Sequence, residues 1–192
     1  MIIRQKPLVS APSQPIPASA NRNWNTEHEA PNVTDFDTRE LRNTLGAFAT
    51  GVTVISALDS NNEPRALTAN SFSSVSLDPP LILWSIGRTS TSFDVFCECK
   101  NFAVHVLRED QTELSQRFAT REARTFDDLA MAHGIGGVPL FDNYVARLQC
   151  ETHECLPGGD HIIIIGKVLD IDLKGGAPLL FHGGRYARLA AE

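Results

Sequence analysis

The chain has 192 residues, with 17 Lys and Arg against 23 Asp and Glu, and a formal net charge of −6. This length predicts one domain or at most two, because domains typically contain roughly 100–200 residues. The acidic balance, without a run of Lys or Arg, argues against a protein that binds nucleic acid through its phosphates. The longest apolar run, residues 162–165, is far shorter than the ~18 residues needed to cross a bilayer, so we expect no membrane contact.

Residues 1–33 are rich in Pro, Ser, Asn and Ala and lack apolar periodicity, which predicts a flexible N-terminal arm before one domain over residues 34–192. Prolines interrupt the stretch before residues 18–20, where a secretory signal would need an apolar core. Four cysteines are too few for a disulfide scaffold. We therefore expect a cytoplasmic protein with free thiols.

The first predicted element is an amphipathic helix. Asp37 and Glu40 have the spacing of a capping box, and apolar residues recur at helical intervals until Gly51. A β-branched strand over residues 52–56 follows, and a turn over residues 59–62 predicts a hairpin with an extended segment over residues 66–77.

The rest of the chain predicts short strands and helices without regular β-α-β alternation. In chain order they are a strand over residues 81–86, a short helix over 92–99, a strand over 102–107, a helix after the capping box Asp110-x-x-Glu113, long strands over 145–155 and 161–173 joined by residues 157–160, and a closing strand over 185–189. Six or seven strands with two or three helices favour a mainly β fold, an antiparallel barrel with added helices.

Searches for catalytic motifs are mostly negative. Glycines 134, 136 and 137 have the wrong spacing and context for a dinucleotide fingerprint, and the sequence contains neither a phosphate-binding P-loop nor a G-x-S-x-G elbow. Cys150, His153 and Cys155 are residue types that bind zinc. However, strand alternation predicts that the two thiols point to opposite faces, so we expect buried thiols and no metal site.

Ordered blocks of sequence over residues 37–190 resemble the short-chain flavin reductase family. The blocks are FATGVTV at 48–54, LTANSFSSVSLDPP at 67–80, FAVHVL at 102–107, GDH at 159–161 leading into IGKV at 165–168, and PLLF at 178–181 before GRY at 184–186. The resemblance implies a Greek-key split β-barrel, a homodimer, and an NAD(P)H:flavin oxidoreductase. Such an enzyme reduces FAD or FMN with NADH and supplies the reduced flavin to a partner monooxygenase.

Short hydroxyl and amide side chains on strand ends can hydrogen-bond a flavin ring without crowding it. Such residues, with their neighbours in the family blocks, are Thr50, Gly51, Val52, Thr53, Thr68, Ala69, Asn70, Ser71 and Ser74. The resemblance implies that the flavin phosphate is bound by Ser85, Ile86, Arg88, Ser90 and Thr91. An arginine there would add fixed positive charge and forked donors.

The resemblance also implies that His161 lies on the nicotinamide side of the pocket, with Phe118 and Tyr186 as walls. Hydride passes directly between the two cofactor rings, so the protein needs no nucleophile and must hold the rings about 3–3.5 Å apart. Trp84 and the Cys97–Cys99 segment are not typical of the family, and the arm is longer than usual.

Two alternatives stay open at this point. One is a barrel with tightly bound FMN that reduces another acceptor, such as ferric iron or a corrinoid. The other is a flavin-binding module without turnover. The sequence leaves open the choice between FAD and FMN and between NADH and NADPH, whether the flavin stays bound or exchanges, and the identity of the partner monooxygenase.

Overall fold

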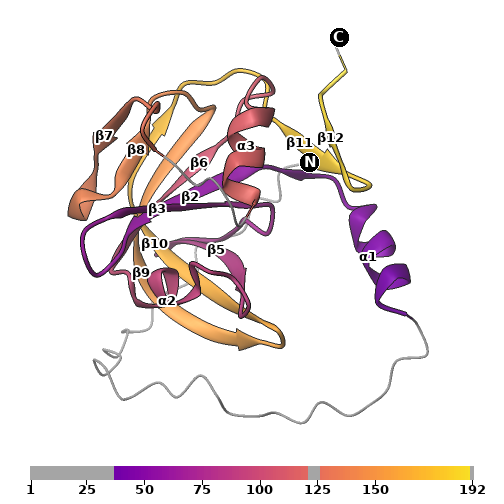
Figure 1. The fold of residues 1–192 in the computed structure, drawn as a ribbon, viewed down its shortest axis with the longest axis horizontal. Helices are drawn as coiled ribbons and strands as arrows, with labels where there is room; N and C mark the ends of the chain where they lie inside the picture. Colours follow the sequence, from indigo (N-terminus) through magenta and orange to yellow (C-terminus); the bar gives the residue numbers. More distant parts are fainter. Residues whose placement is uncertain (1–36, 121–125, 191–192) are drawn as a thin grey trace. The chain divides into compact units, whose positions relative to one another are not determined.

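The computed structural model describes residues 37–120 and 126–190 (Figure 1). The chain divides into two units, residues 1–33 and 34–192, and the described residues all belong to the second. The predicted N-terminal arm lies outside the described residues. In the described part of the chain, every helix is too short or too polar to span a bilayer.

A seven-stranded antiparallel sheet forms the body of the second unit. Its strands, in order across the sheet, are β3 (Pro64–Ala69), β2 (Thr53–Leu58), β6 (Asn101–Val106), β9 (Ala146–Gly158), β10 (His161–Leu173), β5 (Pro80–Gly87) and β4 (Ser73–Leu77). Each neighbouring pair is antiparallel. The prediction of a mainly β, antiparallel fold is confirmed.

The two edge strands, β3 and β4, are consecutive in the chain but do not pair with each other. Only residues 70–72 connect them, and four Cα–Cα steps span at most about 14 Å. The sheet must therefore curl until its edges lie close together, which produces a barrel split between β3 and β4. The prediction of one extended segment over residues 66–77 was wrong, because the chain crosses the split at residue 70.

The remaining strands form two small sheets. They are β1 (Thr50–Gly51), β11 (Leu180–His182) and β12 (Arg185–Ala187) in one, and β7 (Met131–His133) and β8 (Pro139–Phe141) in the other. The short helical turn Ile135–Gly137 lies between β7 and β8. Twelve strands thus occur in the described ranges, more than the six or seven predicted, because strands of two or three residues carry almost no periodicity.

Three α-helices complete the described part: α1 (Thr38–Gly46), α2 (Phe93–Glu98) and α3 (Thr112–Ala119). Asp37 caps α1, because its Oδ1 accepts the N–H of Glu40 at 2.6 Å. This helix ends at Gly46 and not at Gly51. The helix predicted after Asp110 is confirmed, but its N-cap residue is Gln111, whose side chain makes no capping hydrogen bond.

The core has an aromatic centre. Trp84 is fully buried on β5, and its ring meets the edges of Phe96 on α2 and Phe102 on β6 at centroid distances of 5.2 and 5.9 Å. A second cluster, which includes Val54 and Phe118, lies between β2 and α3. Burying side chains of this size contributes roughly 1.5–3 kcal/mol each, so these contacts hold α2 and α3 against the barrel.

The β9–β10 hairpin is built as the sequence predicts, with its turn at Gly159 in the left-handed region (φ 69°). Its register contains a bulge: Ile165 pairs with Glu154 and Gly166 with Thr152, so His153 is the extra residue. The bulge shifts the strand's alternation by one residue. Cys150 and Cys155 are therefore both buried, and the prediction that they point to opposite faces was wrong.

Candidate functional site

A cavity of about 360 Å³ opens at the split of the barrel, where the end of β3 faces the end of β5. Several stretches of the sequence meet there. Ten of the residues predicted for the site line this cavity: Thr68, Ala69, Asn70, Ser71, Ser85, Ile86, Ser90, Thr91, Phe118 and His161. Four residues that were not predicted also line it: Leu67, Gly87, Thr89 and Ala119. These four were missed, although each is a chain neighbour of a predicted residue, which is the signal that could have found them.

The cavity combines apolar and polar surfaces. Leu67, Ile86 and Phe118 are buried apolar residues, whereas Asn70 and Thr91 are exposed amide and hydroxyl side chains. Small-molecule sites in proteins usually have an apolar lining with a few polar groups that fix orientation. The arrangement suits a flat aromatic ring that carries polar atoms along its edge.

Hydrogen bonds between Ser71 and Ser85 join the segment that crosses the split, residues 70–72, to β5 on the opposite side. The Oγ of Ser71 accepts the backbone N–H of Ser85 at 2.9 Å and donates to the Ser85 carbonyl at 3.2 Å. The Ser71 hydroxyl is thus used by the protein itself. It holds Asn70 and the end of β3 beside β5, which fixes the shape of the cavity.

Thr68 and Tyr186 belong to one hydrogen-bonded chain through α3. The Oγ1 of Thr68 donates to the Ser115 carbonyl at 2.6 Å, and the Ser115 Oγ lies 2.9 Å from the Tyr186 hydroxyl. Ser115 is fully buried. Tyr186 does not line the cavity; it supports α3, whose Phe118 does.

His161 begins β10 at the mouth of the cavity, with 48% of its side chain exposed. Its Nδ1 lies 2.7 Å from Oδ1 of Asp160, and this hydrogen bond lowers the pKa of the Asp160 carboxyl. An ionised Asp160 accepts a proton-bearing Nδ1 and leaves Nε2 for other contacts. That Nε2 lies 3.5 Å from where a Cβ on Gly87 would stand, so the ring covers the end of β5.

Arg88 lies next to the cavity between two lining residues, Gly87 and Thr89. Its backbone N–H donates to the Asp160 carbonyl at 2.9 Å, and its Nε donates to the Gly159 carbonyl at 3.1 Å. The guanidinium is therefore held at the β9–β10 turn, close to the rim that carries Ser90 and Thr91.

Besides Arg88 and Tyr186, five predicted residues do not line the cavity, and one of them is Ser74 on β4. Val52 is buried in the core, and Thr53 is buried with its Oγ1 donating to the Ala69 carbonyl at 2.7 Å. Thr50 and Gly51 form β1 and pair with Phe181 and Leu180 of β11. The Oγ1 of Thr50 is buried without a hydrogen-bond partner in the structure.

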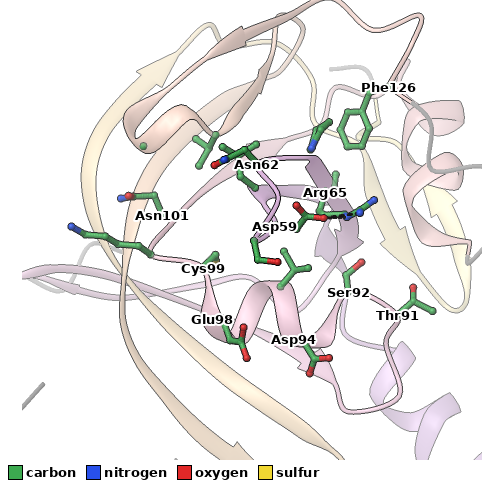
Figure 2. A pocket seen from close by; sticks show the side chains of 18 residues that line it. Asp59, Asn62, Arg65, Thr91, Ser92, Asp94, Glu98, Cys99, Asn101 and Phe126 are labelled. Carbon is green, nitrogen blue, oxygen red and sulfur yellow. Dashed lines mark hydrogen bonds and ion pairs between the residues drawn. The ribbon is translucent and has the colours of Figure 1, made fainter. Parts of the chain in front are cut away.

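A second and larger cavity, of about 690 Å³, adjoins the first and is shown in Figure 2. It lies at the other end of β3, against α2 and the loop that precedes it, and Thr91 lines both cavities. Arg65, Asp94 and Glu98 give it charged side chains. No motif in the sequence pointed to it.

In the part of the chain that the structure describes, no group of three or more His, Cys, Asp or Glu side chains is placed to hold a metal ion. Burial raises the pKa of Cys97, Cys99 and Cys150 to about 12 in each case. The thiolate is the form that binds metals and attacks electrophiles, so the raised pKa disfavours both reactions at these thiols.

The strand order and the cavity define the class of the fold, an antiparallel split barrel with an apolar pocket and a polar rim beside the split. Residues 45–190 match the model of the flavin reductase like domain, and the chain belongs to this family. The predicted family resemblance is confirmed.

Relatives support the family membership. The FMN reductase (NADH) SmoA of Agrobacterium fabrum is 46% identical over 156 residues, covering 81% of this chain and 88% of that protein. The reductase component of the flavin-dependent trigonelline monooxygenase of Acinetobacter baylyi is 40% identical and covers 77% of this chain, which spans about half (48%) of that relative. A solved structure of the Streptomyces globisporus NADH:FAD oxidoreductase SgcE6, with NAD and FAD fragments, gives a TM-score of 0.76 at 39% identity and covers 80% of this chain and 93% of that one.

Proposed function

We propose that this protein oxidises NADH and reduces FMN or FAD at the cavity in the barrel split. The observation that carries the proposal is the convergence of separate sequence stretches on that cavity, with β3, β5, α3 and β10 each contributing to its wall. Relatives named as NADH-dependent FMN and FAD reductases support the same reaction.

The residues present fit a flavin. Leu67, Ile86 and Phe118 offer apolar contact to the ring, while Asn70 and the hydroxyls of the rim can hydrogen-bond its polar edge. Ser90, Thr91 and the guanidinium of Arg88 would hold the phosphate. The bound nicotinamide and flavin supply the hydride chemistry themselves. The chain's role is to orient the two rings and exclude water.

His161 is proposed to contact the nicotinamide side of the reacting pair. Asp160 holds its Nδ1, and the ring stands over Gly87 at the mouth of the cavity. This position lets Nε2 hydrogen-bond a carboxamide or limit how the second ring stacks. The imidazole is thereby a contact residue and needs no proton transfer.

The partner that receives the reduced flavin is proposed to be a separate monooxygenase. Named relatives include the reductase components of a trigonelline monooxygenase and of a tryptophan halogenase system. We also place the reaction in the cytoplasm, because all four cysteines are outside disulfides.

The protein is further proposed to act as a homodimer through α1. None of the nine residues of this helix is buried, and its apolar side chains Leu41 and Leu45, with Phe48 just after it, are 40%, 65% and 78% exposed. Isolated helices shorter than about 12–15 residues are marginal in water. A second copy of the chain that covers this apolar face would stabilise the helix.

The reaction is tested by following the absorbance of NADH with and without added FMN, FAD or riboflavin. We expect NADH oxidation that rises with flavin concentration and saturates. A yellow protein that does not oxidise NADH would instead support a flavin-binding module, and NADH oxidation that no flavin accelerates would contradict the proposal.

A further inference from the structure

The imidazole of His161 reaches the mouth of the cavity in the barrel split from a short turn. β9 ends at Gly158 and β10 begins at His161, so the turn consists of Gly159 and Asp160, both exposed (Figure 1). Gly159 has a φ of 69°, and a Cβ added there would meet no atom of the described residues within 4 Å. Side-chain packing thus contributes little to this turn, and its position depends on hydrogen bonds.

Arg88 holds both residues of the turn. Its backbone N–H donates to the Asp160 carbonyl at 2.9 Å, and its Nε donates to the Gly159 carbonyl at 3.1 Å. The first bond continues the pairing of β10 with β5 one residue beyond His161 and Gly87. The second bond requires an arginine side chain, because lysine has a methylene group in the position of Nε.

These two bonds fix the orientation of Asp160. The Gly159 carbonyl belongs to the peptide plane before Asp160, and the Asp160 carbonyl belongs to the plane after it. Arg88 therefore holds both of the planes that flank the Asp160 side chain. Oδ1 of that side chain lies 2.7 Å from Nδ1 of His161, although 94% of the Asp160 side chain is exposed. A carboxylate so exposed to solvent depends on its backbone for its position.

We propose that Arg88 is a positioning residue for the nicotinamide side of the reaction. Its Nε holds Gly159, the fixed turn directs the Asp160 carboxylate, and the carboxylate holds the His161 ring at the mouth of the cavity. This role rests on the proposed function, because it acts through a histidine that contacts the nicotinamide. It differs from the attraction between the Arg88 charge and a flavin phosphate, which a lysine can also provide.

The test measures kcat/KM for NADH in the wild-type protein, in Arg88→Met and in Arg88→Lys, at saturating FMN and at saturating riboflavin. Riboflavin has no phosphate, so a phosphate contact of Arg88 does not enter the second measurement. We expect both variants to lose about fivefold with either flavin, the loss that one ordinary hydrogen bond represents. The affinity of Arg88→Lys for FMN should stay within about twofold of the wild-type value, because the charge is kept.

A double-mutant cycle with His161→Ala identifies the route by which Arg88 acts. Adding Arg88→Met to His161→Ala should cause no further loss of kcat/KM for NADH, because the residue that Arg88 positions is already absent. A direct contact between the guanidinium and a phosphate of NADH would instead give losses that multiply.

The matched control is Arg108→Met. Arg108 is paired with Asp110 at 3.5 Å, its side chain is 37% exposed, and it lines neither cavity. This variant loses an arginine of similar exposure and should keep the wild-type kcat/KM for NADH.

Three results overturn the inference: wild-type kcat/KM for NADH in Arg88→Lys, a loss in Arg88→Met that occurs with FMN but not with riboflavin, or losses that multiply in the double variant. If Arg88→Met does not fold, Arg88→Lys takes its place in the cycle, since it also lacks the Nε donor. Failure of the proposed function is a separate result, because it is the absence of flavin-dependent NADH oxidation in the wild-type protein.

Discussion

At the scale of single residues, the site depends on side chains whose own hydrogen bonds are already made. Ser71 is committed to the backbone of Ser85, Thr68 to that of α3, and His161 to Asp160. Groups held before a ligand arrives lose little conformational entropy on binding. The Asp160–His161 pair is the place where this can be measured.

We expect Asp160→Ala and His161→Ala each to lower kcat/KM for NADH roughly tenfold, because either change removes an oriented imidazole. The double variant should be no worse than His161→Ala alone, since Asp160 acts through the ring. Flavin affinity should stay at the wild-type value in all three. Effects that simply add would show that Asp160 contributes independently of His161.

His105 predicts a pH dependence of stability. It is fully buried, its Nδ1 lies 3.2 Å from the Val54 carbonyl, and its Nε2 accepts the N–H of Phe141 at 3.2 Å. Burial lowers its pKa from 6.5 to about 3. Between these values the unfolded chain binds the proton and the folded chain does not, so stability falls as the pH decreases below about 6.5.

The expected loss reaches about 1.4 kcal/mol per pH unit in this window. Urea unfolding of the wild-type protein and of His105→Gln, at several values between about pH 7 and pH 5, measures it. The variant should be less stable at neutral pH, because the two backbone contacts are lost, but its stability should change less with pH. Equal slopes for the two proteins would assign the pH dependence to other groups.

At the scale of elements, local signals predicted helices and hairpins well. The cap at Asp37, the Asp59 turn and the glycines before His161 each act over a few residues, and the elements they delimit are present. The crossing at Asn70 was not predictable in this way. Residues 70–72 contain neither Gly nor Pro. The position of the crossing depends on strand pairing, because β3 pairs with β2 whereas β4 pairs with β5.

Part of the candidate site could be predicted from the sequence, and part of it depends on strand pairing and helix packing. Asn70, Ser85 and His161 were predicted for the site through the family resemblance, and all three line one cavity. Thr53 carries the same kind of side chain, but the pairing of β2 with β3 buries its hydroxyl against the Ala69 carbonyl. The second cavity depends on α2 packing beside β3, which is a long-range contact without a local sequence pattern.

At the scale of the whole molecule, the exposed apolar face of α1 predicts self-association. Leu45→Gln combined with Phe48→Gln should convert a dimer to a monomer, because the two side chains are 65% and 78% exposed in one chain and would be buried between two. Analytical ultracentrifugation measures the change. Leu156→Gln, an exposed leucine on β9, is the control and should stay dimeric. A wild-type protein that is monomeric at micromolar concentration would contradict the proposed homodimer.

The position of the flavin site is tested by a fluorescence titration of FMN into Asn70→Trp and into His153→Trp. Asn70 is exposed and lines the cavity in the barrel split, whereas His153 is exposed on β9 and lines neither cavity. If the flavin binds in the split, the indole at position 70 occupies its space, and the Kd should rise at least about tenfold while His153→Trp binds like the wild type. Equal affinity of the two variants, both folded, would place the flavin elsewhere on the protein.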